Sequence, residues 1–405
     1  MFKQHFSRRR LLASLAGLAA APKPLPAADD KLKIVSVDAY PVRLWARSTQ
    51  GTLPKFTSDY DPRRWSYRGP FAQLAGAIMV VIKTDQGVTG YGMGAGGAVA
   101  VKIIEGHLRN LLLGVNPLNV EMLWDQMYTS SNAYGRRGVF VMALSGVDNA
   151  LWDLYGKHAG QPVWRLLGGT TREKAASYFT SSTPEKGLDL GFKHFKMPVR
   201  DGLFEGRAGM QRTVDMLTEA RRTIGPDRGL MIDCSSRWDD VAYTKEMAER
   251  LEAVRLYFIE EPLSPDDVLG YAELVREVEG TLIASGEHEY THHGFKMLFH
   301  HKAVEVVQPD VTWCGGVTAL RRIAAMAHAE GLPFIPHRGG SLFGLPLVLS
   351  QPNATLAESF GTGDSATELM DAVTAPFEKG YYFPPEGAGF GTALTEDLIK
   401  RHVKS

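Results

Sequence analysis

Five polar residues that could carry out chemistry recur at a regular interval in the middle of the chain. Asp233, Glu260, Glu287, Asp310 and His337 each follow a short apolar run, and successive members are 27, 27, 23 and 27 residues apart. That interval accommodates one strand, one helix and two short loops. Because the C-terminal ends of parallel strands open on one face of a closed barrel, we expect the five side chains to meet in one mouth.

The first three of these residues are carboxylates on consecutive predicted strands. Buried negative charges repel one another unless a cation neutralises them. Oxygen ligands favour Mg2+ over zinc, which prefers nitrogen and sulfur. Any one carboxylate could instead form a salt bridge with a Lys or Arg, but three at successive strand ends predict a magnesium site made by Asp233, Glu260 and Glu287. Strand alternation should turn the next residue, Glu261, away from this site toward a structural partner.

The last two residues of the series could form an acid/base pair. Asp310 and His337 end adjacent predicted strands, so the carboxylate could orient the imidazole and raise its basicity. Lys196, on an earlier strand, faces the same mouth from another side. A lone histidine is more often structural, but a histidine beside a divalent ion can remove a proton next to a carboxylate. The pattern therefore indicates α-proton abstraction from a carboxylic acid.

A barrel over residues 166–360 would position these groups. We expect its first strand at 175–180, its second at 192–197 and its eighth at 355–359, which ends in Glu358. Apolar spacing at 213–224, 242–253 and 319–330 predicts helices between the strands. The fold class is α/β, a (β/α)7β modified TIM barrel. Cys234 and Cys314 lie three repeat units apart, which predicts two small buried residues without a disulfide.

The segments around the barrel predict a second domain. Residues 29–165 read as an α+β capping domain: a strand at 33–42, a hairpin at 77–91 and helices at 99–113, 117–130 and 139–158. Asp148 and Asp153 on the last helix are expected to be solvated or to cap. Residues 361–405 form a C-terminal segment, and 381–396 should fold back onto the N-terminal sheet. Gly92, Gly94 and Gly97 match a nucleotide-binding pattern, but they follow a hairpin, so we reject that interpretation.

The remaining features concern partners and location. Lys plus Arg and Asp plus Glu both number 45, which argues against a nucleic-acid partner. The arginines at 8–10, an apolar stretch and a Pro/Ala-rich stretch make residues 1–28 resemble a twin-arginine export signal, with cleavage near residue 21 or residue 28. We therefore expect a periplasmic or exported protein, without a membrane anchor in its mature form, that assembles as a homo-oligomer. The long connection at 49–73 carries arginines among aromatics and is expected to be a substrate lid.

Several strings resemble the enolase superfamily, in its mandelate racemase and muconate lactonizing branch. They are Leu166-Leu167-Gly168-Gly169, Ile259-Glu260-Glu261-Pro262, Gly286-Glu287, Gln308-Pro309-Asp310 and Gly315-Gly316-Val317. Within that branch, the stretches 191–198, 286–295 and 310–316 are similar to L-rhamnonate dehydratases. The resemblance implies that Asp233, Glu260 and Glu287 bind Mg2+, that His337 and Asp310 form the catalytic pair, and that Arg68, His288 and Glu358 contact the substrate.

One departure from the branch bears on the reaction. Racemases of the branch carry Lys-x-Lys on the second strand, whereas here the series is Lys196-Met197-Pro198, so a second base is missing. The expectation is therefore a Mg2+-dependent dehydratase that converts an acid sugar into a 2-keto-3-deoxy acid, with His337, Asp310 and Lys196 as catalytic residues. Two alternatives remain open: an acid-sugar epimerase, racemase or cycloisomerase, and a non-catalytic paralogue that keeps the metal site.

Overall fold

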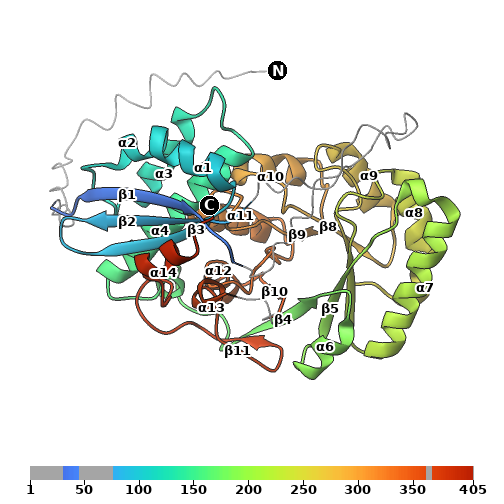
Figure 1. Cartoon of the computed structure of the whole chain (residues 1–405). Helices are drawn as coiled ribbons and strands as arrows, with labels where there is room; N and C mark the ends of the chain where they lie inside the picture. Colours follow the sequence, from blue (N-terminus) through green and yellow to red (C-terminus); the bar gives the residue numbers. More distant parts are fainter. Residues whose placement is uncertain (1–30, 45–75, 362–366, 405) are drawn as a thin grey trace, which may run out of the picture.

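The computed structural model describes residues 31–44, 76–361 and 367–404. Within these residues the chain builds a sheet-and-helix cap beside a barrel, as Figure 1 shows in blue to cyan and in green to orange. The predicted export signal at 1–28, the lid at 49–73 and Arg68 lie outside the described residues. In the described part of the chain, no helix is both long enough and apolar enough to cross a membrane.

The cap begins with the three predicted strands. They form one antiparallel sheet in the order of the chain: β1 (Ile34–Pro41), β2 (Ile78–Thr84) and β3 (Thr89–Gly94). The helices of the cap follow as α1 (Gly97–Ile103), the π-helical η1 (Ile104–Leu108), α2 (Arg109–Leu112), α3 (Val120–Ser130), α4 (Val139–His158) and α5 (Val163–Leu166).

The rejected nucleotide-binding pattern has a packing explanation. A Cβ atom at Gly92 would lie 2.2 Å from the carbonyl oxygen of Gly146 on α4, and one at Gly94 would lie 2.7 Å from that of Met142. Only residues without a side chain allow the helix to approach the sheet this closely. The glycines therefore serve helix–sheet contact.

The barrel strands follow in the predicted order. They are β4 (Ala175–Thr180), β5 (His194–Pro198), β6 (Gly229–Asp233), β7 (Phe258–Glu260), β8 (Leu282–Ser285), β9 (Val306–Val307) and β10 (Ala357–Ser359). Neighbours from β4 to β9 pair in parallel, and β10 pairs in parallel with β4. Between β9 and β10, single bridges at Phe334 close the ring.

The seventh strand differs from the prediction. Instead of a ladder ending at His337, the chain makes only isolated bridges at Phe334 and His337. Pro333 directly precedes Phe334 and Pro336 lies between the two bridged residues, and proline has no N–H to donate to a ladder. The position of the strand is kept, but its regular pairing is lost.

Helices cover the outside of the barrel, which makes the observed fold α/β with the (β/α)7β order. They are α6 (Pro184–Asp189), α7 (Gly206–Ile224), α8 (Val241–Arg250), α9 (Val268–Glu277), α10 (Thr291–His300), α11 (Gly316–Ala329) and α12 (Leu345–Ser350), with the 3-10 segments η2 (Leu203–Glu205) and η3 (Glu252–Val254). Cys234 and Cys314 are free and buried, as predicted.

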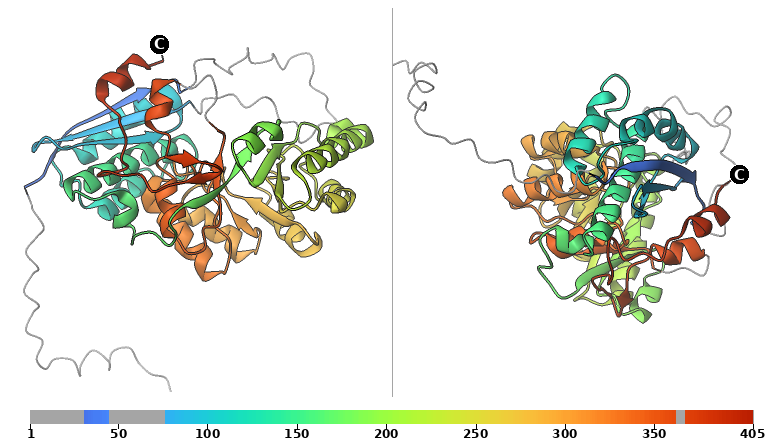
Figure 2. Two further views of the ribbon diagram at one scale, coloured as in Figure 1. Left: turned by 90° about the horizontal axis from the view of Figure 1, so that it is seen from below. Right: turned by 90° about the vertical axis from the view of Figure 1, so that its left-hand side faces the viewer.

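The C-terminal segment contacts both domains, as Figure 2 shows in red. Its elements are α13 (Glu368–Ala372), β11 (Phe377–Glu378), β12 (Tyr381–Tyr382) and α14 (Glu396–Arg401). The prediction that the chain from Tyr381 onward returns to the N-terminal sheet was wrong for β12, which pairs antiparallel with β4 of the barrel. The chain returns to the N-terminal sheet only at Glu396, which contacts Lys83 at 2.5 Å and accepts a hydrogen bond from Tyr40 at 3.2 Å.

Buried polar groups join the cap to the barrel. Asp148 on α4 accepts hydrogen bonds from the backbone N–H of Thr318 at 2.8 Å and from its hydroxyl at 2.7 Å, and so caps α11. Asp153 accepts hydrogen bonds from the backbone N–H groups of Tyr91 and Phe390. Both aspartates are fully buried, so the prediction of a solvated position was wrong, while that of a capping role holds for Asp148.

Candidate active site

The predicted acid/base pair forms at the mouth of the barrel. His337 Nδ1 lies 2.7 Å from Asp310 Oδ2, and a backbone bridge joins the two residues. The other oxygen of Asp310 accepts two hydrogen bonds of 2.6 Å, from the backbone N–H and the hydroxyl of Thr312. Burial alone would raise the pKa of Asp310, but the hydrogen bonds from His337 and Thr312 hold it below its usual value. The carboxylate is therefore charged, and its bond fixes the orientation of the imidazole.

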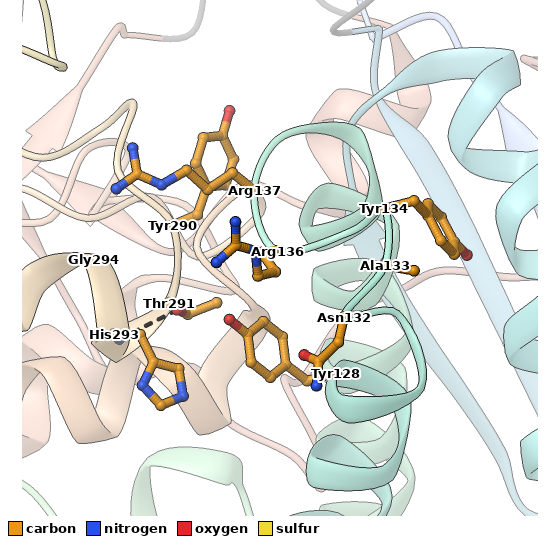
Figure 3. Close-up of a pocket in the computed structure, with 10 residues that line it drawn as sticks. All are labelled: Tyr128, Asn132, Ala133, Tyr134, Arg136, Arg137, Tyr290, Thr291, His293 and Gly294. Carbon is orange, nitrogen blue, oxygen red and sulfur yellow. Dashed lines mark hydrogen bonds between the residues drawn. The ribbon is translucent and has the colours of Figure 1, made fainter.

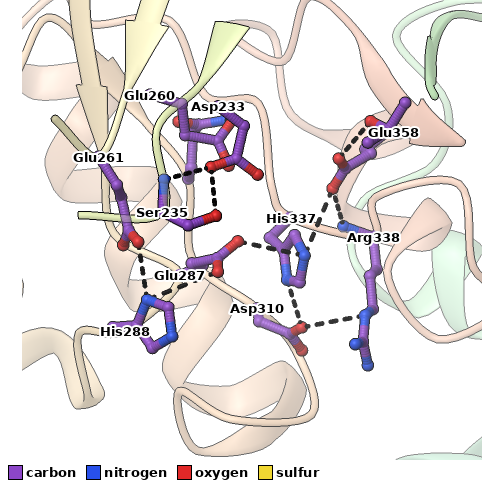
Figure 4. A network of polar contacts seen from close by, with 12 residues as sticks. Asp233, Ser235, Glu260, Glu261, Glu287, His288, Asp310, His337, Arg338 and Glu358 are labelled. Carbon is purple, nitrogen blue, oxygen red and sulfur yellow. Dashed lines mark hydrogen bonds and ion pairs between the residues drawn. The ribbon is translucent and has the colours of Figure 1, made fainter. Parts of the chain in front are cut away.

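The second nitrogen of His337 faces two further carboxylates. His337 Nε2 lies 3.2 Å from Glu287 and 3.7 Å from Glu358 (Figure 4). Burial lowers the pKa of His337, but the charges of Glu287, Glu358 and Asp310 outweigh this effect and raise it to about 9. The imidazole is therefore protonated at neutral pH until the negative charge around it is reduced.

Lys196 lies on β5 and shares the carboxylate of Glu358 with His337. Its Nζ atom is 2.6 Å from Glu260, 2.8 Å from Glu358 and 3.9 Å from Asp233, and the side chain is 1% exposed. Burial lowers the pKa of Lys196, but the carboxylates around it raise the pKa well above its usual value. Lys196 is therefore a fixed positive charge in this arrangement.

The three predicted metal ligands come from neighbouring strand ends of the mouth, but the cluster of described residues whose ligand atoms lie within 4.8 Å of one another is Glu261, Glu287 and His288, which includes neither Asp233 nor Glu260. Asp233 ends β6 and Glu260 ends β7, while Glu287 follows β8 after Gly286, whose φ of 134° turns the chain. Burial, opposed by the charge of Lys196, raises the pKa of Glu260 well above its usual value, and the charges of Asp233, Glu358 and Glu287 add to the rise. Burial likewise raises the pKa of Glu287 to about 7, with Glu261 and Asp233 contributing. The carboxylates therefore repel one another.

Glu261 was expected to point away from this site, and that expectation was wrong. Its φ of 43° ends the extended backbone at Glu260, so strand alternation no longer decides its direction. Its Oε2 atom lies 2.8 Å from Nδ1 of His288, which is 3.5 Å from Glu287. Ligand atoms of Glu261, Glu287 and His288 lie within 4.8 Å of one another. The hydrogen bond to Glu261 occupies the Nδ1 atom of His288.

Glu358 is the central residue of β10, and its side chain contacts both Lys196 and His337. Thr180 donates a hydrogen bond of 2.6 Å to one of its oxygens, and the backbone N–H of Arg338 donates one of 2.8 Å to the other. Burial alone would raise the pKa of Glu358, but the charges of Lys196 and His337 lower it to about 2. Glu358 is therefore an anion between the lysine and the histidine.

The residues that the sequence reasoning missed are mostly neighbours of the predicted ones. Ser235 donates two hydrogen bonds to Asp233, of 2.8 Å from its backbone and 3.0 Å from its hydroxyl, and Gln308 donates one of 2.7 Å to Glu260. The ring of Trp313 lies 5.3 Å from that of His288 and 5.7 Å from that of His337. Arg338, which directly follows His337, places its guanidinium 5.6 Å from the Trp313 ring. Its position next to His337 in the sequence was the one signal that could have identified Arg338 as a site residue.

The donor set fits a magnesium ion. Asp233, Glu260 and Glu287 supply only carboxylate oxygens, which Mg2+ prefers. Six buried or half-buried carboxylates meet in this region, against four cationic or titratable nitrogen groups: Lys196, His288, His337 and Arg338, of which Figure 4 labels the last three. An additional cation would offset the remaining negative charge.

Both domains match known protein families. Residues 67–168 match the mandelate racemase/muconate lactonizing enzyme N-terminal domain, and residues 184–398 match the enolase C-terminal domain-like family. A protein of Caldivirga maquilingensis, provisionally named L-rhamnonate dehydratase, is 39% identical over 339 residues, which cover 82% of this chain and 84% of the relative.

Solved structures agree with this family. Rhamnonate dehydratase from Gibberella zeae complexed with Mg has a TM-score of 0.82 and 29% identity, with 94% of this chain and 98% of that chain covered. The 3,6-anhydro-D-galactonate cycloisomerase from Zobellia galactanivorans has a TM-score of 0.76 and 28% identity, with 92% and 100% covered. The chain thus belongs to the enolase superfamily of enzymes, in the mandelate racemase/muconate lactonizing enzyme family.

Proposed function

We propose that the protein is a Mg2+-dependent dehydratase of an acid sugar such as L-rhamnonate, which it converts into the 2-keto-3-deoxy acid. Both the 39% identical relative and the Gibberella zeae structure are named rhamnonate dehydratases. The observation that carries the proposal is that the site offers one base. His337 is held by Asp310 at 2.7 Å, whereas the residue of β5 that faces the mouth is Lys196, which is paired with carboxylates.

The strand β5 explains why the base is one-sided. Successive side chains of a strand alternate in direction, so Lys196 and the residue two positions later share a face. That residue is Pro198, which cannot accept or donate a proton through its side chain. Lys196 itself is held protonated by Glu260 and Glu358. Racemisation needs a base on each face of the substrate, whereas elimination from one side needs only His337.

In the proposed reaction, His337 Nε2 removes the proton from the carbon next to the substrate carboxylate. Asp310 accepts the hydrogen bond from Nδ1, which keeps the ring oriented and stabilises the imidazolium that forms. Mg2+, held by Asp233, Glu260 and Glu287, would supply positive charge that offsets the carboxylates and the charge developing on the substrate. The imidazolium then returns its proton to the departing β-hydroxyl as the C–O bond breaks, which releases water.

The resulting enol takes up a proton at C3 and becomes the 2-keto-3-deoxy acid, so the net change is the loss of one water.

Lys196 and Arg68 are proposed to bind the substrate carboxylate, and His288 and Glu358 are proposed to bind its hydroxyl groups. Arg338 is a further candidate, because its side chain is 40% exposed beside Asp310, at 3.9 Å. Charged donors in a fork geometry bind carboxylates well.

The test is a panel of aldonic acids that includes L-rhamnonate, with detection of the 2-keto acid product. We expect turnover of at least one acid, loss of turnover in EDTA, and its return with Mg2+. His337→Asn should lower kcat by about 10^3-fold or more, since the base is gone. His328→Asn, at an exposed position on α11, is the matched control. A panel without any metal-dependent 2-keto acid would contradict the proposal.

The rival activities have separate signatures. Epimerisation would place solvent deuterium in recovered substrate with inversion at the α-carbon, and cycloisomerisation would change the substrate without loss of water. A non-catalytic paralogue would bind the acid and leave it unchanged, and His337→Asn would then have no measurable effect. The buried, hydrogen-bonded pair of His337 and Asp310 supports a catalytic protein.

Two further proposals concern the whole protein. We expect residues 1–28 to direct export to the periplasm, where cell fractionation would find the mature chain. We also expect a homo-oligomer, which light scattering of the purified protein would detect. A cytoplasmic or monomeric protein would contradict the respective proposal without affecting the chemistry.

A further inference from the structure

A cavity of ≈ 990 Å³ lies between the cap and the barrel, outside the site described above. Its walls come from α3 and the loop that follows it on one side, and from the segment that begins α10 on the other (Figure 3). The side chains that matter for its chemistry are those of Tyr128, Asn132, Arg136, Arg137, Tyr290 and His293. None of the predicted catalytic or metal-binding residues lines it.

The two arginines of the cavity have different surroundings. Arg137 lies 3.4 Å from Glu289 and 3.5 Å from Asp266, so nearby carboxylates offset its charge. Arg136 forms no ion pair with any residue that the structure describes, and no acidic side chain of the described residues lines the cavity. Figure 3 shows the guanidinium of Arg136 between Tyr128 and Tyr290. Arg136 is therefore an exposed arginine of the cavity whose charge no carboxylate of the described residues offsets.

The rest of the lining is polar and aromatic. The rings of Tyr128 and His293 stack with centroids 5.5 Å apart and planes 21° from parallel. Asn132 adds an amide, and Tyr128 carries a hydroxyl. Such groups donate and accept hydrogen bonds to a hydroxylated molecule, while the ring faces cover its carbon atoms.

The cavity is separate from the catalytic mouth but shares a wall with it. Tyr290 packs against a small apolar cluster that contains Trp313 and Met142. The ring of Trp313 also lies 5.3 Å from that of His288 and 5.7 Å from that of His337. One layer of side chains therefore divides the two sites.

We propose that this cavity is a second binding site, for a small hydroxylated organic anion. Arg136 would bind the carboxylate or phosphate through its planar fork of N–H groups, and Tyr128 and Asn132 would contact the hydroxyl groups. The volume is that of a small-molecule site. The proposal does not depend on the reaction proposed for the catalytic mouth.

The experiment is calorimetric titration of the full chain with gluconate, inorganic phosphate and the neutral polyol sorbitol. The variants are Arg136→Gln, Arg136→Lys, Tyr128→Phe and the control Arg207→Gln, which changes an exposed arginine on α7, away from the cavity. Equal thermal unfolding midpoints would show that all four variants are folded.

We expect an anion-binding event that Arg136→Gln weakens at least tenfold and that Arg207→Gln leaves unchanged. Arg136→Lys should keep part of the affinity, because it retains the charge but loses the fork. If gluconate binds more tightly than phosphate at this Arg136-dependent site, the natural ligand is a polyhydroxy carboxylate. If phosphate binds more tightly, the natural ligand carries a phosphate group. Three outcomes would each overturn the proposal. Arg136→Gln could leave the binding unaffected, or sorbitol could bind as tightly as gluconate. The third outcome is that neither anion binds even at roughly 10 mM, which is 10-fold above typical metabolite levels.

Discussion

At the scale of single residues, Glu287 joins the two halves of the proposed chemistry. It is one of the three carboxylates proposed to hold Mg2+, and its Oε2 atom lies 3.2 Å from Nε2 of His337. The same negative charge that would attract a metal also favours the protonated imidazole. A cation at the carboxylates would therefore help to free His337 to act as a base.

Magnesium affinity should depend on pH through Glu287. Its pKa is raised to about 7, chiefly by burial, so below pH 7 a proton occupies the site that the cation needs. The affinity for Mg2+ should consequently fall about tenfold for each unit that pH drops below 7, as expected for the displacement of one proton. Calorimetric titration between pH 5.5 and 8 measures this. In Glu287→Gln the affinity should be weak with a smaller pH dependence, and a constant affinity in the wild-type protein would contradict the assignment.

Asp310→Asn tests the orienting carboxylate without removing the base. The variant should lower kcat by about 10^2 to 10^4-fold, because the amide no longer fixes the ring or stabilises its cation. Asp310 also raises the pKa of His337, so its loss lowers that pKa and should move the acidic limb of the kcat profile to lower pH. The exposed Asp125→Asn on α3 is the control. An unchanged acidic limb together with unchanged kcat would exclude the orienting role.

At the scale of elements, helix α4 organises the cap and its attachment to the barrel. The β3 glycines let it lie directly on the sheet, while Asp148 on the same helix caps α11 of the barrel. One helix therefore makes two contacts of opposite character. Its contact with the sheet needs glycines on β3 so that the backbones can approach closely, and its contact with α11 needs a buried polar acceptor. Each contact can be tested by a single substitution.

Gly92→Ala should destabilise the protein by about 2–4 kcal/mol. The added Cβ would lie 2.2 Å from the backbone oxygen of Gly146 and 2.3 Å from the backbone nitrogen of Ala150, and neither backbone atom can move without shifting α4. Gly106→Ala is the matched control, because nothing lies within 4 Å of its Cβ position in the π-helical segment. Urea unfolding gives both values. Equal midpoints for the two variants would show that the sheet and helix can separate at low cost.

Asp148→Asn should change how stability depends on pH. Burial raises the pKa of Asp148 in the folded protein to about 7 from 3.8, so between these values the folded state binds more protons than the unfolded state. Stability from this group is thus present at low pH and is lost as pH rises from about 4 to about 7. Asn keeps an acceptor for Thr318 but cannot ionise. Thermal midpoints at pH 5 and pH 7.5 should therefore differ less in the variant, and an equal difference would contradict the buried titration.

At the scale of the whole molecule, the C-terminal segment ties the two domains together. It crosses from β4 of the barrel, where β12 pairs, to the N-terminal sheet, where Val403 bridges to Val42 and α14 packs. Cap and barrel are therefore held together by the described C-terminal segment as well as by the contact of α4 with α11.

Ile399→Ala should destabilise the whole molecule by about 2–4 kcal/mol. Ile399 on α14 is fully buried, and truncating a buried aliphatic side chain removes its burial energy and leaves a cavity. Leu269→Ala on α9 is the control, since that side chain is 69% exposed. Denaturant unfolding followed by fluorescence would measure both. A loss confined to a separate transition, with the main transition unchanged, would show that α14 does not couple the domains.

Several features followed from the sequence because they depend on local periodicity. Apolar runs that end in Asp233, Glu260, Glu287, Asp310 and His337 at intervals of 23 to 27 residues predict parallel strands, and parallel strands bring their ends together. The strand at 175–180 and the helix at 139–158 were predicted with their observed bounds. The barrel, the cap and the meeting of the five polar groups were thus present in the linear pattern.

Other features depend on contacts between distant segments, which no local pattern contains. The positive φ of Glu261 turns its carboxylate to His288, the prolines around Phe334 reduce the seventh strand to bridges, and β12 pairs with β4 instead of the cap. The pKa values of His337 and Glu287 follow from burial and from neighbours that are 27 or more residues away in the chain. The sequence by itself determined which groups meet, since strand period sets that. Only the tertiary structure decided their partners and charges, because burial and short distances between remote residues create both.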